Sequence, residues 1–187
     1  MPTARAGIGR DDKLTQILDA AQARLLAGGY DGMSVAAIAR DLGLAANTIY
    51  WYFGSKDALL AAVARRLLTA QLATKPDGRD PVAKVLWTSD KMSELGFLRT
   101  LVSNRAPHSA EAASLHADLE GWIAQLLTSN LTGSSPLAAT AFRATVEGTI
   151  TLQLPPAQRH QVITWAYQHA LHATGERPSV SRSQRRP

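Results

Sequence analysis

Apolar side chains recur three or four residues apart along almost the whole chain, which is the spacing of helices. The first such stripe places five apolar side chains on one helix face: Leu14, Ile17, Leu18, Ala21 and Leu25. Asp11 or Asp12 is expected to cap this helix, and Gly28-Gly29 to end it. The preceding residues, 1–10, are expected to form a flexible arm.

A second, shorter helix is predicted between Ser34 and Leu42. Ser34 can cap it, and four apolar residues follow at helical spacing: Val35, Ile38, Ala39 and Leu42. Gly43 can take the left-handed conformation that ends a helix. A capped helix, a glycine turn and a further short helix predict a helix-turn-helix.

The third helix, expected over residues 44–53, has two unlike faces. Ile49 and Phe53 share one face, whereas Asn47 and Trp51 point to the opposite side. The first face can pack, and the second offers an amide and an aromatic ring. The major groove of DNA admits a helix, and an Asn side chain can pair with adenine through two hydrogen bonds. The pattern therefore favours a helix that reads DNA.

The rest of the chain reads as helices separated by Gly and Pro. The predicted segments are 55–72, 81–94, 96–104, 109–129, 135–153 and 156–173. No alternating pattern of useful length predicts a strand, so we expect an all-α fold. The predicted domains are 1–54, a three-helix domain with its arm, and 55–174, a larger helical domain. Residues 175–187 have no apolar pattern and read as a disordered basic tail.

The short helices carry the resemblance to a known family. Residues 32–39 (GMSVAAIA), 43–44 (GL) and 48–59 (TIYWYFGSKDAL) resemble the DNA-binding domain of TetR-type (tetracycline-repressor-like) transcriptional regulators. The resemblance covers residues 12 to 60. The chain departs from the family at Ala45, where Ser is common, and this removes a helix cap and a polar contact.

The resemblance implies how the residues would meet DNA. Phosphate anchors would be Thr48, Tyr50, Tyr52 and Lys56. The helix that begins at Ser34 and Val35 would add backbone N–H donors to a phosphate. Asn47 would read a base, with Ala45 and Ala46 against thymine methyl groups. Trp51 would stack on the DNA backbone or pack at the groove wall, and the alternative for Lys56 is a plain solvated lysine.

Small residues gather on the predicted helix 135–153, where they would let another helix approach closely. The resemblance implies that this helix and the last one form a dimer interface. The expected interface residues are Ala141, Thr145, Gly148, Thr149, Leu152, Ala166 and Ala170. The alternative is that these side chains pack inside one subunit. We expect a homodimer, because helix-turn-helix proteins usually read paired half-sites through two-fold symmetry.

The middle helices are rich in large apolar side chains, and the resemblance implies a ligand pocket there. The candidate lining residues are Trp87, Met92, Phe97, Leu101, Leu119, Trp122 and Leu126. The alternative is that this aromatic stripe is ordinary core, which is what such stripes usually form. A pocket of this composition would take a small hydrophobic effector.

Composition changes this picture little. The 187 residues carry a net charge of +5, but residues 1–56 and 57–174 each carry only +1, and residues 175–187 carry +3. The prediction of DNA binding therefore rests on the motif and not on the charge. The chain has no Cys, which excludes thiolate chemistry. No apolar run approaches the ~20 residues of a membrane span, so we expect a cytoplasmic protein without membrane contact.

Catalytic and metal-binding patterns are missing from the sequence. His169 and His172 could share a metal ion, but a third ligand is lacking. No Gly-rich phosphate loop or nucleophile elbow is present. We therefore expect no metal, no cofactor and no enzymatic activity. The favoured hypothesis is a homodimeric repressor, released from a palindromic DNA operator by a small hydrophobic ligand. The alternatives are a DNA-binding regulator without a ligand and a helical enzyme.

Overall fold

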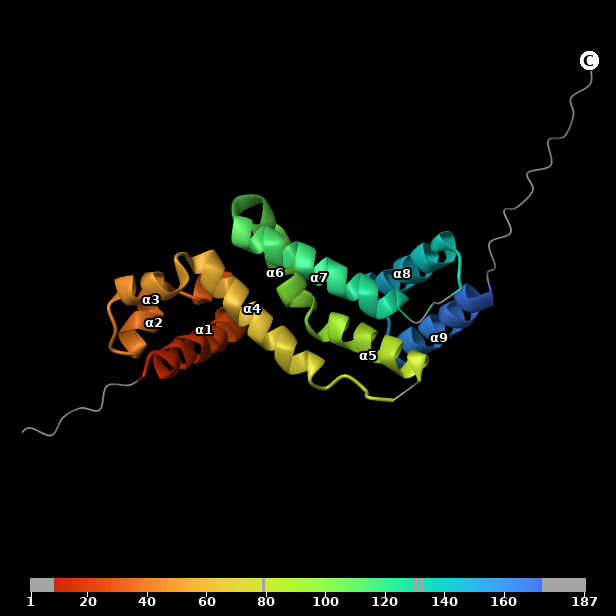
Figure 1. Ribbon diagram of the computed structural model, residues 1–187, viewed down its shortest axis with the longest axis horizontal. Coiled ribbons are helices and arrows are strands. Elements are labelled where there is room, and N and C mark those ends of the chain that lie inside the picture. The colour runs from red at the N-terminus through yellow and green to blue at the C-terminus, as the bar shows by residue number, and fades with distance from the viewer. Residues whose placement is uncertain (1–8, 79, 130, 132, 173–187) are drawn as a thin grey trace, which may run out of the picture. The chain divides into compact units, whose positions relative to one another are not determined.

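The computed structural model describes residues 9–78, 80–129, 131 and 133–172, and every regular element in those residues is helical (Figure 1). The elements in chain order are α1 (Arg10–Gly32), α2 (Val35–Asp41), α3 (Ala46–Phe53), α4 (Lys56–Leu72), α5 (Pro81–Glu94), α6 (Gly96–Arg105), the 3₁₀ helix η1 (Ala106–His108), α7 (Ala110–Thr128), α8 (Pro136–Thr151) and α9 (Pro156–His172). The predicted all-α fold is confirmed. None of the helices in these residues is long and apolar enough to cross a bilayer.

The first helix differs most from its prediction. Gly9 stands at the N-cap position of α1, so Asp11 and Asp12 are not caps. Both lie in the first turn, where a negative charge suits the positive end of the helix dipole. Helical geometry breaks at Gly28-Gly29 as predicted, with Gly29 at φ 62°, but a further turn continues to Gly32. The flexible arm is expected to reach residue 10, but Arg10 is already the first residue of α1. Residues 1–8 of this arm lie outside the described residues.

The chain divides into two compact units. The first unit contains the described residues up to Lys75 together with Leu95–Glu120, and the second contains Pro76–Glu94 and the residues from Gly121 onward. The first unit extends beyond residue 54 because α4 and α6 contribute side chains to the same core as α1 to α3. The functional boundary after residue 54 stays a prediction, and the predicted tail, 175–187, lies outside the described residues.

The core of the first unit fixes α2 and α3. Ile17 of α1, Ile38 of α2, Ile49 of α3 and Leu59 of α4 are fully buried in one cluster. Burying a side chain of this size contributes roughly 1.5–3 kcal/mol. Isolated helices as short as α2 and α3 are not stable in water, so both depend on these contacts.

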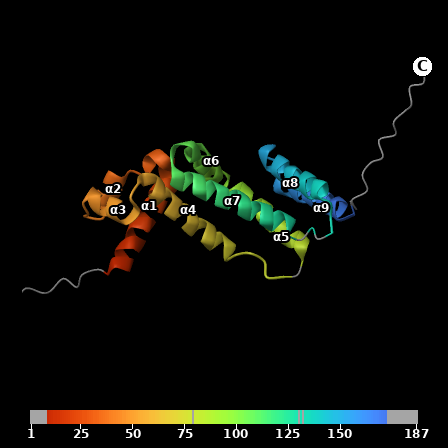
Figure 2. The same cartoon turned by 45° about the horizontal axis from the view of Figure 1, so that its top comes forward.

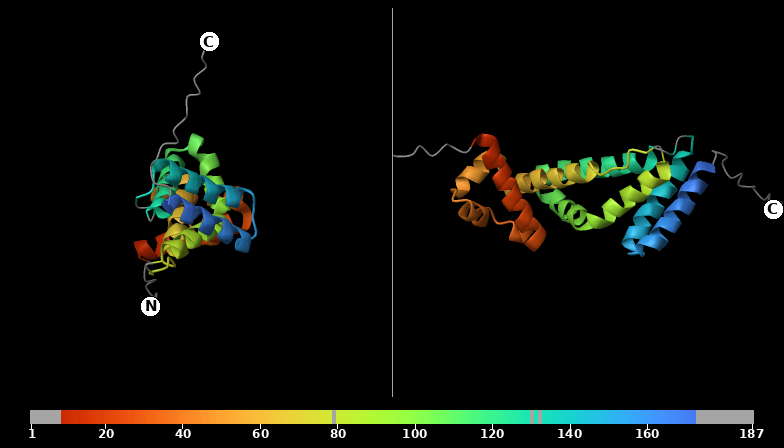
Figure 3. Two further views of the ribbon diagram at one scale, coloured as in Figure 1. Left: turned by 90° about the vertical axis from the view of Figure 1, so that its right-hand side faces the viewer. Right: turned by 90° about the horizontal axis from the view of Figure 1, so that it is seen from below.

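In the second unit, α8 and α9 run side by side and both contact α5 (Figures 2 and 3). Phe142 of α8 meets Tyr167 of α9 edge to face, with the ring centroids 5.7 Å apart. Ser135 caps α8 by accepting a hydrogen bond from the Ala138 N–H at 3.2 Å, and Pro136 follows at the first helical position. Local sequence therefore sets where α8 begins, and the packed rings hold it on α9.

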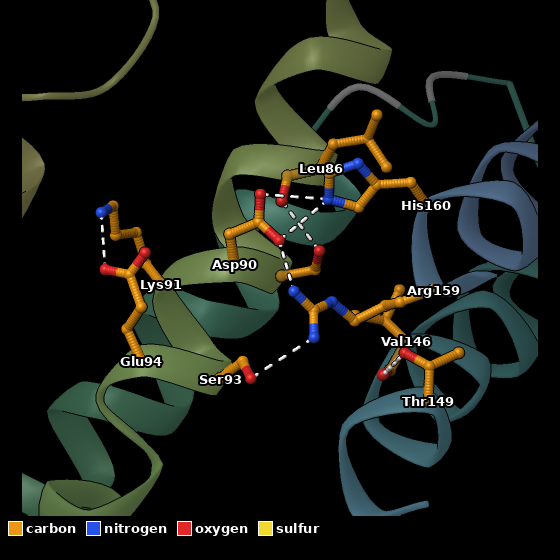
Figure 4. Close-up of polar contacts among 10 residues, drawn as sticks. Leu86, Asp90, Lys91, Ser93, Glu94, Val146, Thr149, Arg159 and His160 are labelled. Atoms are coloured by element: carbon orange, nitrogen blue, oxygen red, sulfur yellow. Dashed lines mark hydrogen bonds and ion pairs between the residues drawn. The ribbon is translucent and has the colours of Figure 1, made fainter. Parts of the chain in front are cut away.

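A partly buried ion pair ties α5 to α9 (Figure 4). Arg159 Nη2 donates to Asp90 Oδ1 at 2.6 Å, and His160 Nε2 lies 2.9 Å from the same oxygen. Burial would raise the pKa of Asp90, but the hydrogen bonds from His160 and Arg159 outweigh it and hold that pKa below its usual range. The pair anchors the first turn of α9.

Candidate DNA-binding interface

A side-chain cap begins α2, as the sequence predicts. The Ser34 hydroxyl accepts a hydrogen bond from the Ala37 N–H at 3.4 Å. Val35, the next residue, is only 5% exposed and packs in the core. The burial of the Val35 side chain is compatible with the expected role of this helix start, which uses backbone N–H groups, and that role stays a prediction.

The turn between α2 and α3 depends on Gly43, whose φ of 64° few other residues adopt without strain. The Leu44 N–H donates to the Ala39 carbonyl at 2.8 Å and closes the turn. Ala45 occupies the N-cap position of α3, and no side chain among the described residues caps this helix. The missing cap that the sequence predicts at Ala45 is therefore confirmed, and the loss of a polar contact there stays a prediction.

α3 presents one buried and one exposed face. Ile49 is 1% exposed, and Phe53 packs partly buried against the same core. Asn47 is exposed on the other side, where Trp51 is 68% exposed and Tyr50 is 44% exposed. The predicted division of α3 into a packing face and an outward face is confirmed.

The other candidate contacts on α3 are less open. Ala46 and Tyr52 are partly buried against the core, Thr48 is partly exposed, and Ala45 before the helix is exposed. The Tyr52 ring meets the Trp51 ring edge-on, with the centroids 5.0 Å apart. Tyr52 therefore supports Trp51 in addition to packing on the core.

Lys56 follows α3 almost directly. Gly54, at φ 77°, ends α3, and Ser55 caps α4 by accepting a hydrogen bond from the Ala58 N–H at 3.0 Å. The Lys56 ammonium lies over the ring of Tyr30, 4.0 Å from its centroid. A cation–π contact of this kind orients a lysine that would otherwise be free to move.

Sequence reasoning misses the partners of Asp57. Its carboxylate accepts hydrogen bonds from Tyr30 Oη at 2.7 Å and from Arg105 Nε and Nη2 at 3.0 and 2.8 Å. Arg105 also lies over the Tyr30 ring, 4.7 Å from its centroid. The Arg105 guanidinium holds the pKa of Asp57 below its usual range, and burial together with the bond to Asp57 raises the pKa of Tyr30 to about 12. This network joins α1, α4 and α6 close to the end of α3.

The sequence of α3 contains no charged side chain. Arg10, the first residue of α1, instead places its guanidinium 5.2 Å from the centroid of the Trp51 ring. The positive charge next to α3 therefore comes from two neighbouring helices, from Arg10 at the start of α1 and from Lys56 at the start of α4. No sequence signal pairs Arg10 with Trp51, since they lie far apart along the chain.

Three of the seven expected dimer residues are buried inside the second unit. The side chains of Thr149, Ala166 and Ala170 are buried and therefore leave little surface for a partner subunit, and the dimer interface itself stays a prediction. Small residues suit close packing within a subunit as well as between subunits, and here the first arrangement holds. Ala141 and Leu152 are exposed, and Thr145 and Gly148 are partly exposed.

An outward stripe does exist on α8. We call the following residues the outer stripe of α8: Leu137, Ala141, Ala144, Gly148 and, at the C-cap position, Leu152. They recur at helical spacing, and Leu152 is 72% exposed. On α9, Trp165 is 60% exposed and lines a shallow groove with His160, Gln161, Thr164 and Gln168. Large apolar side chains left this open are typical of interaction surfaces when they gather in a patch.

The candidate ligand residues fall in both units. Phe97, Leu101 and Leu119 belong to the first unit, and Leu119 is part of its core. Trp87, Met92, Trp122 and Leu126 belong to the second unit, where Met92 is a core residue and Trp122 is exposed. Their role in binding a ligand stays a prediction.

Comparisons with known proteins agree with this geometry. The sequence model described as "Bacterial regulatory proteins, tetR family" matches residues 17–63, which run from α1 into α4. No curated protein matches the chain.

Several solved structures share the fold. A transcriptional regulator from Rhodococcus sp. Rha1 is 20% identical with a TM-score of 0.65, covering 84% of this chain and 95% of its own. A protein from Saccharomonospora viridis, assigned as a transcriptional regulator and crystallised with choline, is 18% identical with a TM-score of 0.65, covering 86% and 97%. A TetR-like transcriptional regulator from Rhodococcus sp. RHA1 is 20% identical with a TM-score of 0.55, covering 90% and 99%. Residues 17–63 therefore form a helix-turn-helix that matches the TetR family model, in a chain that has the fold of TetR-like transcriptional regulators.

Proposed function

We propose that this protein is a homodimeric transcriptional repressor that binds a palindromic DNA operator and is released from it by a small ligand. The observation that carries the proposal is the outward face of α3, where Asn47, Tyr50 and Trp51 are exposed opposite the buried Ile49. None of these three side chains is required by the core, and a helix of this size fits the major groove.

The roles on DNA follow from the chemistry of the exposed groups. Asn47 reads a base, because its amide can pair with adenine through two hydrogen bonds. Tyr50, Thr48 and Lys56 donate to phosphates, and the capped start of α2 adds backbone N–H groups. Phosphate contacts fix the position of the protein on the duplex, and Asn47 supplies the sequence information.

Dimerisation is assigned to the outer stripe of α8 together with the exposed face of α9. The stripe has leucines at both ends and small residues between them, which lets a second helix approach closely. A two-fold pair of subunits would present two copies of α3 to two half-sites, so the operator would be a palindrome.

The effector is assigned to the helices that follow the helix-turn-helix domain. The neighbour crystallised with choline supports the idea that this fold accepts a small molecule, although this chain's candidates, such as Trp87 and Met92, favour an apolar one. A ligand that prefers a conformation with the two recognition helices misplaced would weaken DNA binding by linkage. A regulator without a ligand is the second candidate, since both Met92 and Leu119 are core residues.

Selection of bound duplexes from a random DNA library tests the proposal. The full-length protein should enrich a palindrome, and Tyr50→Ala, which removes an exposed side chain, should lose the enrichment while staying folded. Asn47→Ala should relax the selected sequence at one base pair of each half-site. No enrichment with the wild-type chain would refute a sequence-specific regulator.

A second measurement addresses the effector. The selected duplex is titrated with protein in the presence of choline, as a cationic probe, and of octanoate, as an apolar probe. A loss of DNA affinity with either probe supports a ligand-released repressor. Unchanged affinity across apolar and cationic probes would favour the regulator without a ligand.

A further inference from the structure

The contact between Arg10 and Trp51 joins the first turn of α1 to the exposed face of α3. The Arg10 guanidinium carbon lies 5.2 Å from the centroid of the Trp51 ring. Both side chains are exposed, and Trp51 keeps 68% of its surface open. Within the described residues, Arg10 makes no ion pair and no hydrogen bond through its side chain. Within the described residues, the ring of Trp51 is therefore the partner that orients this guanidinium.

A guanidinium over an indole keeps its hydrogen-bonding capacity. The cation is attracted to the face of the ring, while the N–H groups at its edge remain free to donate. Arg donors form a rigid fork that matches the oxygens of a phosphate. The Arg10–Trp51 pair is thus a positioned anion-binding group at the edge of the helix that the proposed function puts in the major groove.

Charge at the interface argues for phosphate as the partner. α3 brings no cation of its own, although neutralising phosphates supplies much of the affinity of DNA-binding proteins. Lys56 shows a similar arrangement, since its ammonium lies 4.0 Å from the centroid of the Tyr30 ring. An aromatic ring therefore holds a cation at two places next to α3.

We propose that Arg10 contacts a phosphate of operator DNA and that Trp51 is its positioning residue. Trp51 then acts on DNA through Arg10, and not by reading a base or by stacking on the DNA backbone itself. The inference rests on the proposed function, because it assumes that α3 lies in the major groove. It adds to that function a residue outside the helix-turn-helix and a reason for a tryptophan on an exposed helix face.

The salt dependence of DNA affinity separates this role from a structural one. Each phosphate neutralised by a cation contributes roughly 0.9 to the slope of log affinity against log salt concentration. For a dimer with two Arg10 side chains, Arg10→Ala should reduce the magnitude of that slope by about 1.8. Lys84→Ala on α5, in the second unit, makes the same change in net charge outside the helix-turn-helix and should leave the slope unchanged.

Variants of Trp51 complete the test on the full-length protein and its selected operator. Trp51→Ala should lower the slope as far as Arg10→Ala does, and the double variant should lower it no further. Trp51→Phe, which keeps an aromatic face, should restore most of the slope. Thermal unfolding should be unchanged in all of them, because both side chains are exposed.

Distinct outcomes overturn distinct claims. If Arg10→Ala leaves the slope unchanged, or if Lys84→Ala lowers it equally, Arg10 is not a phosphate contact. If Trp51→Ala changes the selected base sequence and keeps the slope, Trp51 reads DNA directly. If the wild-type chain binds no DNA, the proposed function fails together with the inference, and this result differs from the first two because it appears before any substitution is made.

Discussion

Replacing Ile49 by Ala tests whether the recognition helix is held by its buried face. Ile49 is 1% exposed in the cluster that contains Ile38 and Leu59. The substitution removes three carbon atoms, worth about 2.4 kcal/mol of transfer free energy at roughly 0.8 kcal/mol each. The cavity left behind adds to this loss, so the free energy of unfolding should fall by about 3–4 kcal/mol. That corresponds to more than ~100-fold in the ratio of folded to unfolded protein.

Urea denaturation followed by far-UV circular dichroism measures this loss. The chain has two compact units, so the transitions are fitted separately if two are seen. The matched control is Tyr50→Ala at the next position, because Tyr50 is 44% exposed. The free energy of unfolding of this control should change by less than about 0.5 kcal/mol.

Two results would refute the reasoning. A loss below about 1 kcal/mol for Ile49→Ala would mean that this part of the core collapses without cost or that Ile49 is not buried. Equal losses for Ile49→Ala and Tyr50→Ala would mean that α3 has no distinct packing face. Either result would also remove the basis for assigning Asn47 and Trp51 to DNA.

Three further predictions address other elements. Ser34→Ala should destabilise the first unit by about 1 kcal/mol in urea denaturation, and Ser34→Thr should lose less because a hydroxyl still caps α2; equal losses would contradict the cap. Ultraviolet titration should show one tyrosine ionising near pH 12, absent in Tyr30→Phe. Because the pKa of Tyr30 is raised in the folded protein, the stability that this tyrosine adds to the fold is complete below pH ~10 and is lost as the pH rises through 12. Titration of all tyrosines near their ordinary pKa would exclude the bond to Asp57. Ala141→Arg in the outer stripe of α8 should convert a dimer to a monomer in sedimentation velocity, whereas Ala113→Arg on the exposed face of α7 should not.

The helix-turn-helix could be predicted from sequence because its signals are local. Ser34, Gly43 and Ser55 each act within four residues along the chain, through a cap or a positive φ. The faces of α3 follow from helical spacing alone, since one turn separates Ile49 from Phe53. Such features do not depend on where the rest of the chain lies.

Features that depend on tertiary packing could not be predicted in this way. Asp57 pairs with Arg105 across 48 residues, and the spacing of charges along the sequence does not indicate this partner. Thr149 and Ala166 are small enough to suit either a core or a subunit interface, so composition alone could not decide that they are buried. Asp11 failed as a cap because Gly9, two residues earlier, holds the N-cap position and the helix already begins at Arg10.

The separation of the two faces of α3 has a consequence for how operator preference can change. Asn47, Tyr50 and Trp51 are all exposed, so substitutions there leave the core of the first unit intact. A library randomised at these positions should remain folded in nearly every member. New binding preferences could then be selected, in the laboratory or by evolution, without first gaining extra stability to tolerate them.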